Sequence, residues 1–375
     1  MQTRTARMIC RLKQFRQSKG LSQGQIAELV GVKRQAIYDI ESGRYLPNTA
    51  VALRLARQLG CRVEDLFSEE GDEAAQPVLM AEGQGSSSPR ISLAKVRGHL
   101  FGYPLDAEHV FGHELRAADG ILEGSGDRVR LFTTPEYLDK TILLLGCDPA
   151  FSLLAAHVSR ASPAARVSCR FASSHRALER LSAGRAHIAG THLHNSSGED
   201  SNVLAARTKL SGIGGLVIGF SVMEEGLMVA PGNPHGIRST AELAREGIRM
   251  VNREQGAALR ILLDEHLAQC GIPHTAVEGY DKEVRTHNEG AQMVAYGAAD
   301  AALGLCSVAS AFGLGFVPMA RVRCDLVIPG DMLEHPAIQV ILDVLQSKSL
   351  HQEIASLPGY DPSQTGKIIA EIRSP

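Results

Sequence analysis

The segment LSQGQIAELVGVKRQAIYDIESGRY, residues 21–45, has the pattern of two short helices joined by a tight turn. Ser22 is a preferred N-cap residue for the first helix, and Gly31 supplies the turn after it. The apolar side chains with the spacing of a shared core are Ala27, Val32, Ile37 and Ile40. Because such a core fixes one helix against the other, we predict a helix-turn-helix unit here.

The sequence on both sides extends this unit into a helical domain over residues 8–67, called the head below. A further helix is expected after Pro47, where Asn48-Thr49 is a start signal. An earlier helix is predicted by a stripe formed by Ile9, Leu12, Phe15 and Arg16. The head is therefore expected to be all-α.

Charge separates the head from the remainder of the chain. The 375 residues have a formal net charge of -2, which by itself indicates neither a nucleic acid nor a membrane partner. Residues 1–68, however, contain 12 Lys and Arg against 5 Asp and Glu, a balance of +7 that leaves -9 for the rest. A basic domain fused to an acidic body is typical of a phosphate-binding module with a separate partner.

Seven cysteines lie singly along the chain, without a C-x-x-C pair. This pattern favours reduced thiols over a disulfide framework or a zinc site. The N-terminus lacks an apolar signal segment, and no stretch approaches the roughly 20 apolar residues of a membrane span. We expect a cytoplasmic protein without a membrane partner, a cofactor or a metal.

In a helix-turn-helix unit the second helix enters the major groove of DNA. Arg34 has a forked guanidinium that suits guanine, and Gln35 has an amide that suits adenine. Tyr38 and Asp39 have an alternative, solvated or intrahelical role, and we expect Glu41 to stabilise the fold. The candidate DNA-binding residues are Ser22, Gln23, Lys33, Arg34, Gln35, Tyr38, Asp39 and Arg44.

The pattern S-Q-x-x-x-A-x-x-x-G-V-x-x-x-x-I-x-x-x-E-x-G, followed by P-N, resembles the Xre/Cro family of phage and bacterial repressors over residues 12–67. The resemblance implies a five-helix domain in which Gln23, Arg34, Gln35 and Asp39 face DNA and Arg44 lies near the backbone. One such head covers about half a turn of duplex, so a homodimer on a twofold operator is expected.

Residues 68–90 are acidic and then rich in Gly and Ser, which indicates a flexible linker. Residues 91–140 alternate apolar and polar side chains over much of their length and predict a short strand-rich connecting region without an assigned role. From residue 141 short apolar strands alternate with helices of about ten residues. This alternation predicts an α/β body with parallel strands.

Ligands of open α/β sheets bind beyond the carboxyl ends of the strands. The residues at those ends in the body are Asp148, Ser173, Ser174, Thr191, His192, Asn252, Arg253, Gln255, Gly256, Ala257 and His287. Helix capping is the alternative role for Asp148, Ser173 and Ser174. Partial protonation of His287 would suit an anion. His192 and His194, two residues apart, are not expected to share a metal ion.

The order of segments in GLMVAPGNPHGIRSTAELAREGIRMVNREQGAALRILLDEHL and AADAALGLCSVASAFGLGFVPM resembles a type II periplasmic-binding-protein fold. The resemblance spans residues 141–372, and it is greatest to the domain of molybdate-related regulators and some molybdopterin-biosynthesis proteins. It implies two α/β lobes joined by crossing strands. Relatives have hydroxyl residues in the turn that here reads Gly256-Ala257-Ala258, so backbone amides would replace two side-chain donors.

The expected fold is therefore multidomain, an all-α helix-turn-helix head with a two-lobed α/β, periplasmic-binding-protein-like body. The expected function is a transcriptional regulator that binds operator DNA and senses a small anion, with molybdate or tungstate favoured. A sensor of an organic ligand, such as a molybdopterin precursor or a carboxylate, is the alternative. An enzyme with an autoregulatory head is a further alternative, disfavoured because no nucleophile elbow, P-loop or H-E-x-x-H motif is present.

Overall fold

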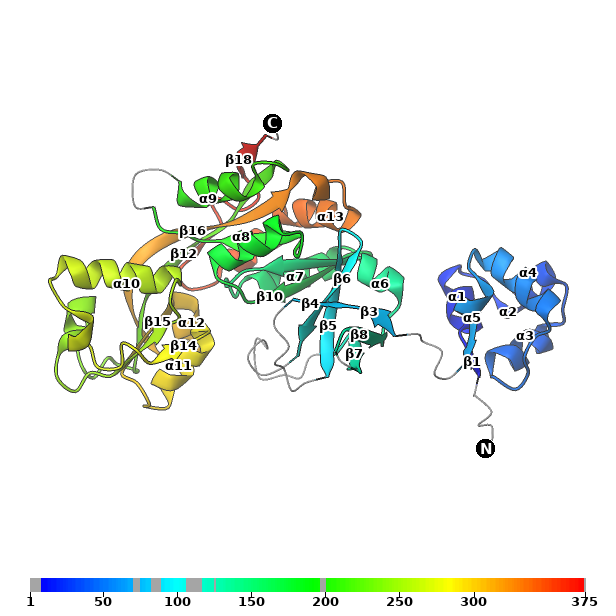
Figure 1. The fold of residues 1–375 in the computed structure, drawn as a ribbon, viewed down its shortest axis with the longest axis horizontal. Helices are drawn as coiled ribbons and strands as arrows, with labels where there is room; N and C mark the ends of the chain where they lie inside the picture. Colours follow the sequence, from blue (N-terminus) through cyan, green and yellow to red (C-terminus); the bar gives the residue numbers. More distant parts are fainter. Residues whose placement is uncertain are drawn as a thin grey trace. The chain divides into compact units, whose positions relative to one another are not determined.

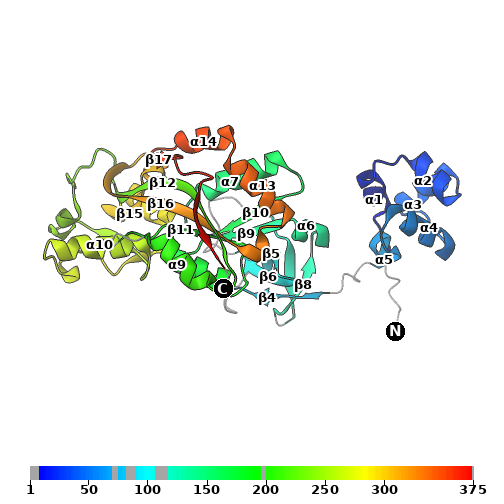
Figure 2. The same ribbon diagram turned by 90° about the horizontal axis from the view of Figure 1, so that it is seen from above.

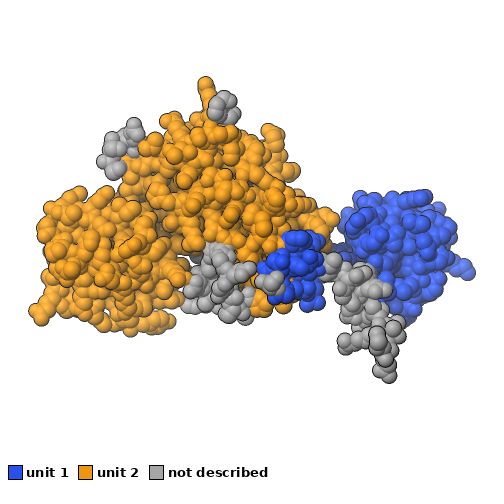
Figure 3. Space-filling model, in the orientation of Figure 1, with its two compact units in different colours: residues 1–77, 123–131 blue, residues 78–122, 132–375 orange. Residues whose placement is uncertain are grey.

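The computed structural model describes residues 8–69, 75–81, 89–105, 117–124, 126–195 and 200–373. The chain divides into two compact units, residues 1–77 with 123–131 and residues 78–122 with 132–375 (Figure 3). None of the described helices is long and apolar enough to cross a membrane.

The head contains the five helices that the resemblance implied: α1 (Leu12–Ser18), α2 (Gln23–Val30), α3 (Arg34–Glu41), α4 (Thr49–Leu59) and α5 (Val63–Leu66). Ser22 caps α2, with its hydroxyl accepting a hydrogen bond from the Gln25 amide. Gly31 then ends α2 in the left-handed region at φ 72°, which glycine adopts without strain. The fully buried side chains of this core include Leu12, Ile26, Ile37, Ile40 and Leu55.

The start of the head differs from the sequence prediction. Residues Met8–Cys10 form strand β1, which pairs antiparallel with β2 (Phe67–Glu69), so Ile9 does not extend the helical stripe. The Arg11 amide donates to the Leu66 carbonyl at 2.9 Å. A partner strand 57 to 61 residues away therefore decides the conformation of this segment, which local spacing cannot reveal.

The body is built on one ten-stranded sheet with the order β10-β9-β11-β16-β12-β15-β13-β14 (Figure 1). Strands β17 and β18 pair with β12 outside this path. The strands are β9 (Thr141–Leu145), β10 (Arg166–Arg170), β11 (Ile188–Thr191), β12 (Gly215–Val229), β13 (Met250–Arg253), β14 (Glu283–Val284), β15 (Ala301–Leu305), β16 (Gly315–Pro329), β17 (Tyr360–Asp361) and β18 (Ile368–Ile372). Strand β9 is parallel to β10 and β11, and β13 is parallel to β14 and β15.

Two strands of 15 residues, β12 and β16, join two lobes and pair antiparallel along their length (Figures 1 and 2). The first lobe contains β9, β10 and β11, and the second contains β13, β14 and β15. The apolar runs at residues 216–220 and 226–231 predict two separate strands, but the structure has a single strand over residues 215–229. Register shifts between Gly219 and Ser221 and between Glu225 and Gly226 mark the part of β12 that passes between the lobes.

Helices cover both lobes. They are α6 (Pro135–Asp139), α7 (Phe151–Ala161), α8 (Ser174–Ser182), α9 (Ser201–Leu210), α10 (Ala258–Gln269), α11 (His287–Ala295), α12 (Cys306–Ala311), α13 (Pro336–Leu345) and α14 (Lys348–Ala355), with 3-10 turns η1 (Thr240–Ala244), η2 (His274–Ala276) and η3 (Gly330–Met332). Helix α7 packs tightly on the sheet, because a Cβ on Gly190 would lie 2.3 Å from the Phe151 ring. Helices α6, α9, α13 and α14 were not predicted from the sequence.

Short strands are also present between residues 76 and 131. Within the second unit β5 (Arg90–Val96) pairs with β6 (His99–Pro104) and β7 (Gly120–Glu123), and β4 (Leu79–Met80) pairs with β6. In the first unit β3 (Gln76–Pro77) pairs with β8 (Arg128–Leu131). Strands β3 and β4 fall inside the segment predicted as a linker, where residues 70–74 and 82–88 lie outside the described part.

Buried Asp119 joins these strands to the first lobe. Its carboxylate accepts hydrogen bonds from the Ser92 hydroxyl at 2.9 Å and the Leu93 amide at 2.8 Å. The same carboxylate accepts from Arg166 Nη1 at 2.9 Å, at the start of β10. The connecting region is therefore fixed to the body by an ion pair with a buried carboxylate.

Candidate functional site

The second helix of the helix-turn-helix unit, α3, presents an exposed polar face. Lys33, Arg34, Gln35 and Tyr38 are exposed, and Arg44 places its guanidinium 5.7 Å from the centre of the Tyr38 ring. Gln35 Nε2 donates to Asp39 Oδ1 at 3.2 Å, so these two predicted DNA contacts are also partners of each other.

The N-terminus of α2 is held by contacts within the head. Gln23 Nε2 donates to Glu41 Oε2 at 2.8 Å, and Arg16 Nε donates to Glu41 Oε1 at 2.6 Å. Burial opposes ionisation of Glu41, but the hydrogen bonds from Arg16 and Gln23 outweigh it and lower the pKa of this carboxyl. Glu41 thus stabilises the fold, as expected, and orients the Gln23 amide beside the capping residue Ser22.

In the body, residues of both lobes line a small cavity of about 10 Å³. This volume holds about one water molecule. The residues that line it are Cys147, Ser173, Ser174, His192, Arg253, Glu254, Ala257, Ala258, Leu259 and His287. We call it the cleft cavity. Six predicted ligand residues, drawn from the ends of four strands, lie together in it: Ser173, Ser174, His192, Arg253, Ala257 and His287.

The other five predicted ligand residues do not line the cleft cavity. Asp148, Thr191 and Asn252 are buried, whereas Gln255 and Gly256 line a separate pocket of about 410 Å³ beside Arg260. Thr191 Oγ1 donates to the Asp325 carbonyl at 3.5 Å. The Asn252 side chain donates to the Tyr280 carbonyl at 3.0 Å. The side chains of Thr191 and Asn252 thus form hydrogen bonds to the backbone within the body.

Asp148 connects three distant segments. Its carboxylate accepts hydrogen bonds from the Ala150 amide at 2.8 Å, the Tyr360 hydroxyl at 2.6 Å and the Ser221 hydroxyl at 3.1 Å. Burial raises the pKa of Asp148, and the Tyr360 hydrogen bond opposes that rise. Asp148 does not cap α7, whose N-cap is Ala150 without a side-chain capping hydrogen bond; its carboxylate instead connects the segment before α7 with β17 and the crossing strand β12.

Arg253 supplies a buried guanidinium to the cleft cavity, with 3% of the residue exposed. Its Nε and Nη2 donate to the Glu254 carboxylate at 3.1 Å each, and Nη2 also donates to the Arg285 carbonyl at 2.9 Å. Its Nη1 lies 3.2 Å from His287 Nδ1, and the Phe171 ring lies 5.5 Å from the guanidinium carbon. These contacts fix the orientation of the charge before any ligand binds.

The two histidines that line the cavity are both buried, which lowers the pKa of each ring. Burial first, and then the neighbouring Arg253 charge, lower the pKa of His287 well below its usual range. The expectation that His287 is partly protonated is therefore wrong, because a neutral ring accepts a hydrogen bond from Arg253. Burial also lowers the pKa of His192 and raises that of the Cys147 thiol, whose Sγ lies 3.4 Å from His192 Nδ1.

Ser173 and Ser174 lie at the N-terminus of α8. Ser173 occupies the N-cap position but makes no side-chain capping hydrogen bond. Ser174 Oγ accepts from the His192 amide at 3.0 Å, which ties α8 to the end of β11. Helix α10 also begins at the cavity, where its N-cap Ala257 has no side chain to offer. Free amides at both helix starts favour a negative group.

Glu225, a residue of β12, lies between His192 and His194. It was not among the predicted site residues. It is fully buried, with Oε1 3.4 Å from His192 Nε2 and Oε2 2.9 Å from His194 Nε2. Neither contact has hydrogen-bond geometry. The two histidines, on the irregular segment after β11, thus converge on one carboxylate. Among the described residues, no group of three or more His, Cys, Asp or Glu is arranged to hold a metal ion.

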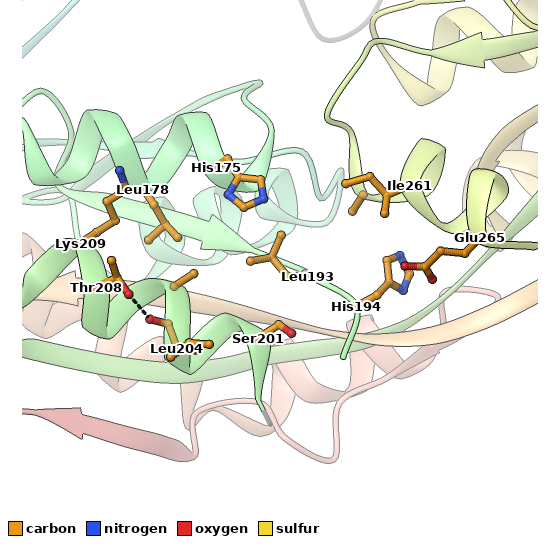
Figure 4. A pocket seen from close by; sticks show the side chains of 12 residues that line it. His175, Leu178, Leu193, His194, Ser201, Leu204, Thr208, Lys209, Ile261 and Glu265 are labelled. Carbon is orange, nitrogen blue, oxygen red and sulfur yellow. Dashed lines mark hydrogen bonds between the residues drawn. The ribbon is translucent and has the colours of Figure 1, made fainter. Parts of the chain in front are cut away.

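A larger groove of about 440 Å³ adjoins this cluster. Its lining residues are His175, Leu178, Leu193, His194, Ser201, Leu204, Ala205, Thr208, Lys209, Ala258, Ile261 and Glu265. Figure 4 shows Lys209 and Thr208 at one end of it, and His194 with Glu265 at the other. We call it the lobe groove, because α8 and α9 of the first lobe and α10 of the second contribute to it.

Comparisons with known proteins agree with this architecture. A model described as the PBP superfamily domain matches residues 155–346, and a helix-turn-helix model matches residues 12–66. The uncharacterized protein YvgK of Bacillus subtilis is 28% identical over 230 residues, 61% of this chain and 74% of that protein. An uncharacterized HTH-type transcriptional regulator of Archaeoglobus fulgidus is 38% identical over 66 residues, 18% of this chain and 94% of that protein.

Among solved structures, the sulfate-binding protein SubI of Mycobacterium tuberculosis is similar with a TM-score of 0.43 and 15% identity, over 60% of this chain and 87% of that chain. A helix-turn-helix head joined to a two-lobed body defines a DNA-binding regulator with a ligand-binding domain. The chain belongs to the PBP superfamily, and its N-terminal domain is of the Xre type.

Proposed function

We propose that the cleft cavity binds the anionic group of a small ligand and that this binding changes the affinity of the head for operator DNA. The buried Arg253 guanidinium is the observation that carries the proposal. It lines the cavity beside the starts of α8 and α10, where an anion would replace the Glu254 carboxylate as the partner of its N–H groups.

Closure of the lobes gives the sensor its two states. Because the cleft cavity holds only about 10 Å³, a ligand must enter when the lobes are further apart and then be enclosed. A ligand shifts an equilibrium only by its differential affinity for the two states. Strand β12 passes from lobe to lobe, and the Asp119–Arg166 ion pair connects the first lobe to the strands on its N-terminal side.

Molybdate and tungstate are the first anions to test. The full chain is titrated with molybdate, tungstate, sulfate and phosphate, and its melting temperature is recorded. Stabilisation by molybdate and tungstate, but not by sulfate, supports an oxyanion sensor. Arg253→Gln should abolish the stabilisation, whereas Arg238→Gln, at an exposed position of the same lobe, should retain it. An unchanged response of Arg253→Gln would refute the assignment.

For the head, we propose that Ser22, Gln23, Lys33, Arg34, Gln35, Tyr38, Asp39 and Arg44 form the DNA-binding face, and that the chain acts as a homodimer. Arg34 and Gln35 are exposed at the start of α3, the part of the recognition helix that reads base edges. Sedimentation of the full chain with an operator fragment tests the stoichiometry. One protomer per operator would contradict the dimer.

A further inference from the structure

The lobe groove and the cleft cavity are neighbouring parts of one surface. Ala258, in the first turn of α10, lines both. On α8, Ser174 lines the cavity and the next residue, His175, lines the groove. After β11, His192 lines the cavity and His194 lines the groove. Three separate segments therefore carry the surface from one site to the other.

The two sites differ in size and chemistry. The cleft cavity has a charged, hydrogen-bonding lining and a volume of about 10 Å³, whereas the lobe groove has about 440 Å³. Much of the groove lining is apolar and consists of Leu178, Leu193, Leu204, Ala205 and Ile261. Leu204 and Ile261 are 52% and 41% exposed, although large apolar side chains gain free energy from burial.

We infer that the ligand is an organic acid whose anionic group binds at Arg253 in the cleft cavity and whose apolar body occupies the lobe groove. This inference rests on the proposed function of the cleft cavity and names the class of ligand. A bare tetrahedral oxyanion would leave the groove empty. An acid with an apolar body fills it and covers Leu204 on α9 and Ile261 on α10.

The groove also explains how such a ligand acts on the lobes. Helices α8 and α9 belong to the first lobe and α10 to the second, so an apolar body between them contacts both. Those contacts exist together only when the lobes are close. The apolar body therefore stabilises the closed state, and the anionic group provides the recognition.

Straight-chain carboxylates test the inference on the full chain by isothermal titration calorimetry. Each methylene buried in an apolar site strengthens binding about fourfold. Affinity is therefore expected to rise about 200-fold from butyrate to octanoate. Octanol, which has the apolar body without the charge, should bind far more weakly than octanoate. Equal affinities along the series, or for octanol and octanoate, would overturn the inference.

Variants assign the effect to the groove. Ala205→Trp fills the groove, and Leu204→Gln makes its exposed wall polar without burying a new group. In both variants, the affinity should depend less on the chain length of the carboxylate. Ala295→Trp, at an exposed position of α11 that lines neither site, should leave it unchanged. A chain-length dependence that survives both groove variants would contradict the site.

The proposed function and this inference fail differently. Arg253→Gln should lower the affinities for butyrate and for octanoate by the same factor, since it removes the anion contact alone. If Arg253→Gln leaves both affinities unchanged, the cleft cavity is not the anion site. If molybdate binding depends on Arg253 but the carboxylate series is flat, the proposed function stands and the organic ligand is refuted.

Discussion

Acid should destabilise the first lobe through His187, which precedes β11. The ring is buried, and its Nδ1 accepts a hydrogen bond from the Leu143 amide on β9 at 3.0 Å. Burial, and then the nearby His335, lower the pKa of His187 to about 4, although a hydrogen bond with the Lys95 backbone opposes the shift. The folded lobe therefore keeps this ring neutral where an unfolded chain would protonate it.

The magnitude follows from the two pKa values. An unfolded histidine has a pKa of about 6.5, so the unfolded state binds a proton below that pH while the folded state does not. The stabilising contribution is complete above about pH 6.5 and is lost as the pH falls toward 4. Between pH 7 and pH 5 the free energy of unfolding should fall by about 2 kcal/mol from this residue.

Hydrogen exchange of peptides that cover β9 and β11, measured in the full chain at several urea concentrations, reports the unfolding free energy of this lobe. His187→Asn keeps an acceptor near Nδ1 and removes the titration. Between pH 7 and pH 5, the free energy of unfolding of the first lobe should therefore fall by about 2 kcal/mol less in the variant than in the unmodified chain. His99→Asn, at an exposed position, is the control. An identical pH dependence in the His187→Asn variant would refute the reasoning.

Three further predictions concern single contacts. Arg34→Ala should weaken operator binding by about 1–3 kcal/mol in a gel-shift assay, with an unchanged melting temperature; full affinity would remove Arg34 from the interface. Glu41→Gln should destabilise the head by about 2 kcal/mol, seen as faster hydrogen exchange in α2, because its buried arginine partner loses a counter-charge. Gly190→Ala should lower the free energy of unfolding by about 1–3 kcal/mol, because the added Cβ meets the Phe151 ring. Gly212→Ala should leave stability unchanged, since no heavy atom lies within 4 Å of a Cβ there. Equal melting temperatures for the two variants would contradict the packing.

The helices of the head could be predicted because their signals are local. Ser22, Gly31 and Asn48 each fix a helix end through contacts within four residues, and the structure has those caps. Strand β12 was divided in two because Glu224 and Glu225 interrupt its apolar run. Its continuity depends on pairing with β16, about 100 residues further along the chain, and that pairing leaves no local pattern.

The candidate site shows the same division. Arg253 and His287 were found because they follow strands, where parallel topology brings side chains together. Glu225 was missed because it lies inside a strand, and its place beside His192 and His194 is set by the path of β12 between the lobes. Leu204 on α9 was not predicted either, because the lobe groove that it lines is formed by helices of two different lobes.

A ligand bound in the body should change DNA binding by the head. The most direct test measures the affinity of the full chain for an operator selected in vitro, with and without saturating octanoate or molybdate, whichever of the two binds. We predict a change of about 5–150-fold in operator affinity, the usual range of allosteric coupling, that is absent in Arg253→Gln. Equal operator affinities with the ligand bound and absent would contradict it.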